Sequence, residues 1–138
     1  MIATKHKVFC SFAFTGEDEA TLNQRMQLIV QAFKDVGVEA YCNLFDARVD
    51  EFTAPKQFMD AALEEINTCD IVFVVMASDR RSEGMLVEVG AAYALGKKIV
   101  LARHQSANGK TYLDKLADKT IDWETNEDLQ HLVKDLVA

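Results

Sequence analysis

The sequence predicts an α/β domain in which a parallel sheet lies between two layers of helices. Short apolar runs alternate along the chain with segments of helical periodicity, an order typical of repeated strand–helix–strand units. The runs at residues 71–76 and 99–102 are apolar without polar alternation. Such continuous runs are typical of central parallel strands, which helices cover on both faces. We therefore expect a three-layer α/β/α sandwich connected by right-handed crossovers.

The first half of the chain predicts two strands, each followed by a helix. In order, we expect a strand at 7–12, a helix at 18–36, a strand at 38–42, a polar irregular loop at 43–53 and a helix from 55 to about 67. The first helix carries apolar residues at three- and four-residue spacing. Asp18 can cap its start and Gly37 ends it. Pro55 opens the second helix at the position where proline is best tolerated.

The second half predicts three more strands. In order, we expect a strand at 71–76, a helix at 84–95, a strand at 98–103, a short helical piece at 112–117, a strand at 120–123 and a last helix. Gly96 ends the third helix. Thr125 with Asp128 resembles a capping box at the start of the last helix. Five such strands favour a five-stranded flavodoxin-like sheet with strand order 2-1-3-4-5.

The bulk composition is that of one globular domain. The 138 residues, 49% of them hydrophobic, suffice to bury a core without disulfide or metal support, so we assign 1–138 to a single domain. The net charge of −7 provides no basic surface for phosphate backbones, which argues against nucleic acid or an anionic membrane as the partner. No apolar stretch reaches the length of a membrane span.

The cysteines and the first residues predict a reducing compartment. Cys10, Cys42 and Cys69 are odd in number and form no C-x-x-C pair, so neither a zinc site nor a disulfide framework is expected. Each lies at or beside a strand, where we expect a small buried hydrophobe. The first seven residues lack the long apolar region of a signal peptide, so we expect a cytoplasmic protein.

Candidate site residues follow the carboxyl ends of the predicted strands, where ligands bind in open parallel sheets. They include Ser11, Phe12, Asp46, Asp79, Ser82 and Gly84. Ser82 and Gly84 open the third helix, where free N–H groups and a hydroxyl bind anions such as phosphate. An N-cap serine and a turn glycine explain the same two residues equally well. Asp79 is either an acid–base group or a solvated loop residue.

Glu88 lies about one turn into the third helix, on the side expected to face this edge of the sheet. A glutamate near a helix start also complements the helix dipole and needs no further role. However, Val87 and Val89 flank it and small residues follow at 90–92, which indicates a largely buried helix whose carboxylate faces a cavity. A partly buried carboxylate is a functional candidate.

No motif supports a bound metal or cofactor. His104 lacks cysteine or carboxylate partners at metal-ligand spacing, and neither G-x-G-x-x-G nor G-x-x-x-x-G-K-[ST] occurs in the chain. We therefore expect no metal site, no dinucleotide cofactor and no P-loop chemistry.

The third helix and its start resemble the nucleoside 2-deoxyribosyltransferase family through the run Ser82-x-Gly84-Met85-x-x-Glu88-x-Gly90-x-Ala92-x-Ala94-Leu95-Gly96-Lys97. That family includes relatives that hydrolyse nucleoside monophosphates, and its order of elements is similar over nearly the whole chain. The resemblance implies that Glu88 attacks the anomeric carbon, expels the nucleobase and forms a covalent glycosyl-enzyme. The sugar then passes to a second base or to water, as in retaining glycosidases.

The resemblance also implies roles for other residues. Ser82 falls where nucleotide-hydrolysing relatives carry a phosphate-binding serine, which favours a 5′-phosphorylated substrate, and Met85 belongs to the same substrate-binding run. Where those relatives place a basic residue after the first strand, this chain has Phe14. The family's aspartate on the helix before the third strand falls on Ala62. Asp60 is the nearest catalytic substitute and requires a shift in helix register.

The same resemblance implies the partners. The ligand would be a small nucleoside or nucleotide, with neither nucleic acid nor a membrane involved. Family members assemble as homodimers or larger homo-oligomers in which a neighbour completes the active site.

A second resemblance provides an alternative. Residues 8–12, followed by Gly16-Glu17-Asp18, resemble the opening of a TIR domain. TIR domains share the flavodoxin-like layout; some cleave the nicotinamide bond of NAD and others are signalling adaptors. A third alternative is a non-catalytic nucleotide-binding protein. Replacing Glu88 by glutamine separates this last alternative from the enzymes, because a binding module tolerates the change.

Overall fold

The chain folds around one five-stranded sheet. The structure, a computed structural model, describes residues 7–14 and 16–137, so the first six residues, where we expect no signal peptide, lie outside it. The strands are β1 (Lys7–Phe12), β2 (Glu39–Tyr41), β3 (Ile71–Met76), β4 (Lys98–His104) and β5 (Lys119–Trp123). All neighbouring pairs are parallel and the order is β2-β1-β3-β4-β5, which confirms the flavodoxin-like sheet.

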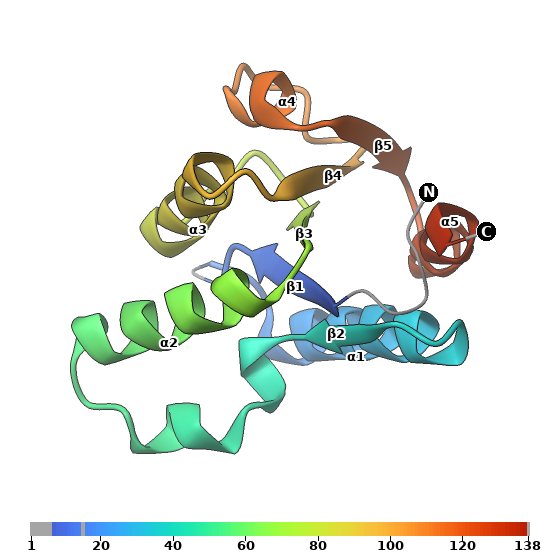
Figure 1. Cartoon of the computed structure of the whole chain (residues 1–138). Helices are drawn as coiled ribbons and strands as arrows, with labels where there is room; N and C mark the ends of the chain where they lie inside the picture. Colours follow the sequence, from blue (N-terminus) through green and yellow to red (C-terminus); the bar gives the residue numbers. More distant parts are fainter. Residues whose placement is uncertain (1–6, 15, 138) are drawn as a thin grey trace.

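Helices cover both faces of the sheet. They are α1 (Glu19–Asp35), α2 (Pro55–Thr68), α3 (Glu83–Ala94), α4 (Leu113–Leu116) and α5 (Asn126–Val137). Figure 1 shows α1 and α5 on one side of the sheet and α2 and α3 on the other. The predicted α/β/α sandwich is therefore confirmed. Each face has its own hydrophobic core, one beneath α1 and α5 and one beneath α2 and α3.

The alternation of side chains along β1 assigns each residue to one of these cores. Val8, Cys10 and Phe12 belong to the core beneath α1 and α5, whereas Phe9 belongs to the core beneath α2 and α3. Because successive side chains in a strand point to opposite faces, Ser11 also faces the α2–α3 side. It is fully buried.

The structure contains the capping interactions from which the helix boundaries were predicted. Asp18 accepts the N–H of Thr21 at 2.9 Å at the start of α1. Gly37, just past α1, adopts φ +82°, the left-handed conformation that ends a helix and favours glycine. Thr125 and Asp128 accept each other's backbone N–H at 3.1 and 2.9 Å, the reciprocal bonds of a capping box.

Two expectations about local structure are wrong. Residues 43–53 are not wholly irregular, because they contain two short 3₁₀ helices, η1 (Asn43–Phe45) and η2 (Ala47–Glu51). Helix α3 is not largely buried either. Its inner face is buried, but Leu86 and Val87 are 45% and 48% exposed. Apolar composition therefore did not distinguish a helix enclosed by the core from one with an uncovered apolar side.

The described residues contain neither a membrane-spanning helix nor a metal-binding cluster. None of the helices in the described part of the chain is both long and apolar enough to cross a bilayer. Residues 7–14 and 16–137 also contain no group of three histidine, cysteine or acidic side chains placed to hold a metal ion.

Candidate active site

A partly buried hydrogen bond joins Ser11 to Glu88 at the carboxyl end of β1. The Ser11 hydroxyl donates to Glu88 Oε1 at 2.7 Å. On α3 the buried residues Met85, Val89 and Ala92 recur at four- and three-residue spacing. Glu88 lies three residues after Met85, so its carboxylate extends from the inner side of α3 toward the sheet. The prediction that Glu88 faces this edge of the sheet is confirmed.

Burial of the Glu88 carboxylate changes its acidity. Desolvation raises the pKa of Glu88 to about 7 from 4.5, and the hydrogen bond from Ser11 partly opposes this rise. Removal from water disfavours the charged form of a carboxyl group, and a donor to the carboxylate favours it. Glu88 is therefore held near half ionisation at neutral pH, in the range where a carboxylate can act as base, acid or nucleophile.

The three cysteines have the buried, inert character that the sequence predicts. All three are free and buried. Burial raises the pKa of the Cys42 thiol to about 12, and the nearby charge of Glu88 adds to the rise. A thiol with such a pKa is protonated at neutral pH and is a poor nucleophile. Cys42 belongs to the core beneath α1 and α5, so its thiol does not compete with Glu88 for the chemistry.

The start of α3 forms the outer part of the same site. The Ser82 hydroxyl accepts the N–H of Met85 at 3.1 Å, so Ser82 is the N-cap of α3, and Met85 is buried beneath it. A Cβ atom built on Gly84 would meet nothing within 4 Å. Gly84 precedes Glu88 by four residues, so the two residues lie on the same face of α3, one turn apart. The space beside Gly84 is therefore open on the face of α3 that carries Glu88. A phosphate role for Ser82 stays a prediction.

The remaining candidates at the first and third strand ends are held by the fold. The ring of Phe12 belongs to the core beneath α1 and α5, on the face opposite Glu88. Asp79 accepts the backbone N–H of Gly109 at 2.9 Å and so ties the β3–α3 loop to the β4–α4 loop. Binding of substrate by either residue stays a prediction.

Asp46 lies in a separate ion-pair network. It accepts from the Tyr41 hydroxyl at 2.7 Å and from the Arg48 guanidinium at 2.7 Å. Arg48 also bonds Glu65 at 3.0 Å, and Glu65 pairs with Lys7 at 2.8 Å. Lys7 is the first residue of β1, so this network extends toward the edge of the sheet opposite Ser11. The Arg48 hydrogen bonds hold the pKa of Asp46 well below its usual range.

Asp60 is not brought into contact with the Ser11–Glu88 pair. Its carboxylate pairs with Lys56 at 2.7 Å on α2, and its side chain is 60% exposed. The buried residues of α2 are Ala62 and Ile66. No hydrogen bond or ion pair joins Asp60 to Ser11 or Glu88, all three being within the described residues. A catalytic role for Asp60 stays a prediction.

One contact at this edge of the sheet was missed by the sequence analysis. Arg80, in the β3–α3 loop, donates from Nη1 to the carbonyl oxygen of Gly16, in the β1–α1 loop. Gly16 has φ +83°, and a Cβ atom on it would lie 3.0 Å from Arg80 Cζ. The glycine therefore permits both the backbone turn and the close approach of the guanidinium. No local pattern could have revealed a contact between residues 64 positions apart.

Comparisons with known proteins identify the family and the fold. Residues 9–128 match the sequence profile of nucleoside 2-deoxyribosyltransferases. No curated protein sequence matches the chain at a significant level. A CMP N-glycosidase from Clostridium botulinum, BcmB, is similar in structure with a TM-score of 0.70 and 23% identity, over 94% of this chain and 98% of that one.

Two further structures share the fold. A 2-deoxyribosyltransferase from Bacillus psychrosaccharolyticus has a TM-score of 0.65 and 22% identity, over 90% of each chain. A flavodoxin-like domain from Synechococcus has a TM-score of 0.55 and 11% identity, over 94% of each chain. Identities this low show the fold alone, whereas the profile match covers most of the sequence, including the Ser11 and Glu88 positions. The chain belongs to the nucleoside 2-deoxyribosyltransferase family.

Proposed function

We propose that the protein cleaves the N-glycosidic bond of a nucleoside or a nucleoside 5′-monophosphate, with Glu88 as the nucleophile. The observation that carries the proposal is the partly buried hydrogen bond from Ser11 to Glu88 at the carboxyl end of β1. The family assignment supports the same bond and the same class of substrate.

Each of the two steps forms and breaks one bond at the anomeric carbon. The Glu88 carboxylate attacks this carbon, the C–N bond breaks, and the bonding electrons leave with the base, which takes up a proton. A glycosyl ester of Glu88 results. In the second step water or another base attacks the same carbon and the ester oxygen departs. Two inversions give net retention, as in retaining glycosidases.

Ser11 positions the nucleophile in this scheme. Its hydroxyl binds Oε1, which leaves Oε2 for attack on the sugar. Donation of a hydrogen bond also favours the ionised carboxylate, the form that attacks. The surrounding burial removes water that would otherwise solvate this charge and weaken the nucleophile.

Asp60 is the candidate proton donor to the leaving base that follows from the family pattern. To act, its carboxylate would have to leave Lys56, to which it is bound at 2.7 Å. If Asp60 is the donor, Asp60→Asn lowers kcat most for substrates with poorly leaving bases. An unchanged kcat across bases would remove Asp60 from the mechanism.

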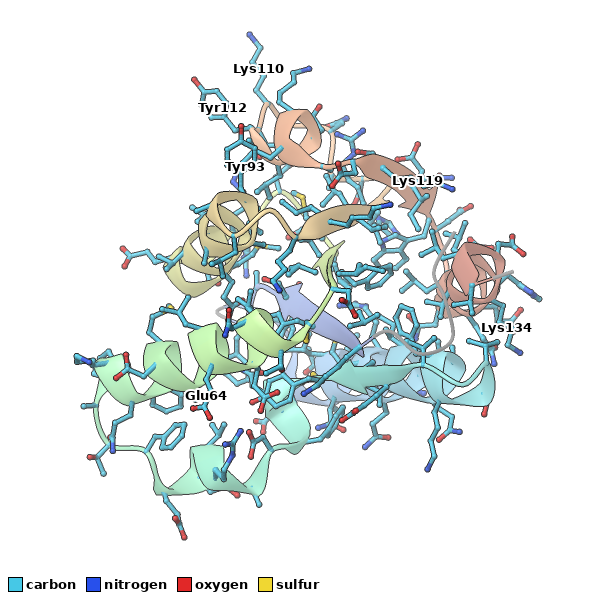
Figure 2. All side chains as sticks on the ribbon, in the orientation of Figure 1. Glu64, Tyr93, Lys110, Tyr112, Lys119 and Lys134 are labelled. Carbon is cyan, nitrogen blue, oxygen red and sulfur yellow. The ribbon has the colours of Figure 1, made fainter. Side chains whose placement is uncertain are left out.

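A homo-oligomer is proposed from the uncovered apolar surface of α2 and α3. Its large exposed side chains are Phe58, Leu63, Leu86, Val87, Tyr93 and Leu95. Tyr93 lies on the side of α3 toward α4 in Figure 2 and is 62% exposed. Exposed apolar side chains gathered on two neighbouring helices are typical of an interface. Analytical ultracentrifugation should give a dimer or larger species that Val87→Lys dissociates; a wild-type monomer would refute the proposal.

Chromatography of reaction mixtures tests the proposed reaction. The protein is incubated with nucleosides, their 5′-monophosphates and NAD, with and without a free acceptor base. Base release or exchange should occur from a nucleoside or nucleotide and be lost in Glu88→Gln. Glu83→Gln, on the same helix, serves as the matched control and should retain turnover. Nicotinamide release alone would favour the TIR-like alternative, and no turnover by the folded protein would contradict the proposal.

A further inference from the structure

Arg80 connects the two loops that border the Glu88 site. The β1–α1 loop follows Phe12, and the β3–α3 loop precedes Glu83. β1 and β3 are paired neighbours, so their carboxyl ends and the loops that follow lie together. The guanidinium of Arg80 rests on the backbone of Gly16 and donates to its carbonyl oxygen. This contact holds the cation at the rim of the site.

The face of α3 beside Glu88 is open for one helical turn toward the helix start. Gly84 is open to solvent where a side chain would be, on the same face of α3 as Glu88. The four residues between them correspond to a rise of about 6 Å along the helix. A sugar with its anomeric carbon at Glu88 would fill this turn and direct one substituent toward the β3–α3 loop, which carries Arg80.

The other charged groups of these loops have partners of their own, and Glu17 interacts electrostatically with Arg25 on α1. Asp18 accepts two hydrogen bonds from Thr21, and Asp79 accepts the N–H of Gly109. Arg81 donates to the carbonyl oxygen of Lys110 at 3.4 Å. Arg80 uses one of its five N–H donors on Gly16, which leaves a planar set of donors for an anion. The planar, forked arrangement of guanidinium N–H groups matches phosphate oxygens better than a lysine ammonium does.

We infer that Arg80 binds the 5′-phosphate of the substrate and thereby selects nucleoside 5′-monophosphates over nucleosides. The inference rests on the proposed function, because it places the anomeric carbon at Glu88. The guanidinium is the specificity-determining group, and Gly16 is required because a larger residue would displace it.

The test compares Arg80→Gln with Arg81→Gln. Glutamine at position 80 keeps a donor for Gly16 but lacks the charge and the fork, and the control removes the same charge one residue away. Wild type should have a kcat/KM for 5′-monophosphates far above that for the matching nucleosides. Arg80→Gln should lower kcat/KM for monophosphates about 10- to 100-fold, the usual effect of losing a charged hydrogen-bonded pair. It should change nucleoside turnover less than about twofold, and Arg81→Gln should change neither.

A binding measurement separates this inference from the proposed reaction. Calorimetric titration of Glu88→Gln with a 5′-monophosphate and its nucleoside should show a preference for the monophosphate that Arg80→Gln abolishes. That preference in a protein that turns over nothing would support the inference and contradict the proposed function. Equal turnover of both substrates, unaffected by Arg80→Gln, would do the reverse. Equal losses on both substrates would show that Arg80 only supports the loop.

Discussion

Replacing Glu88 by glutamine should stabilise the folded protein at neutral and alkaline pH. The carboxylate is desolvated, and its pKa in the folded state is about 7 against 4.5 for an exposed glutamate. Between pH 4.5 and 7 the unfolded chain releases a proton that the folded chain retains. The free energy of unfolding therefore falls as the pH rises through this window. Glutamine carries no charge and can still accept the Ser11 hydrogen bond.

The size of the gain follows from the shift in pKa. A rise from 4.5 to about 7 is about 2.5 pH units, and each unit is worth about 1.4 kcal/mol. Above pH 7, Glu88→Gln should thus raise the free energy of unfolding by about 3 kcal/mol. For a chain of 138 residues this is a rise in Tm of about 10 °C. Below pH 4.5 both proteins carry a neutral side chain, so the difference should vanish.

Urea unfolding followed by circular dichroism at pH 4.5, 6 and 8 measures this dependence. Glu83→Gln is the matched control, because Glu83 lies in the first turn of the same helix and is exposed. It should lose up to about 1 kcal/mol at pH 8, since an acidic residue there favours the helix dipole. If Glu88→Gln were no more stable than wild type at pH 8, the carboxylate would not be desolvated and our account of its acidity would be wrong.

Three further predictions concern the site and its surroundings. Ser11→Ala should raise the pKa of Glu88 by about one unit, because the carboxylate loses its hydrogen-bond donor. The acidic limb of the pH profile of kcat/KM should then move to higher pH. An unmoved limb would show that Ser11 only fills space. Gly84→Leu should lower kcat/KM about 100-fold, because the leucine side chain would fill the space beside Glu88. Unfolding measurements should show that the same change raises the free energy of unfolding by about 0.5–1 kcal/mol, since leucine favours the helix more than glycine does. Retained activity would mean that substrate does not occupy this space. Asp46→Asn should cost about 2 kcal/mol of stability at pH 7. This loss should shrink as the pH falls below about 4, where the unfolded chain takes up the proton, and vanish only below the depressed pKa of folded Asp46. A raised KM without loss of stability would instead support substrate binding by Asp46.

The parts of the fold that the sequence predicted are those set by local chemistry. Asp18, Gly37 and Pro55 mark helix ends through capping, a left-handed backbone and a fixed φ, all of which act within a few residues. The apolar runs located the strands for a similar reason. The exposed side of α3 was not predicted, because apolar residues such as Val87 look alike in sequence whether a core or a subunit covers them.

The candidate site was predicted only in part. Its place at the carboxyl ends of the strands and the position of Glu88 followed from topology and helix periodicity. The hydrogen bond between Ser11 and Glu88 joins residues 77 positions apart, and only the packing of α3 on β1 creates it. Likewise, the sequence shows Phe14 where a basic residue was expected after β1, whereas the folded chain supplies Arg80 to that loop from another element.

Trapping the covalent intermediate tests the central claim most directly. The protein is mixed with a substrate that it turns over, quenched in acid within milliseconds, digested and analysed by mass spectrometry. Our account predicts that the peptide containing Glu88 gains the mass of the sugar, or of the sugar phosphate, as an ester, and that Glu88→Gln yields neither adduct nor turnover. Undiminished base release by Glu88→Gln, or a glycosyl adduct on another residue, would contradict it.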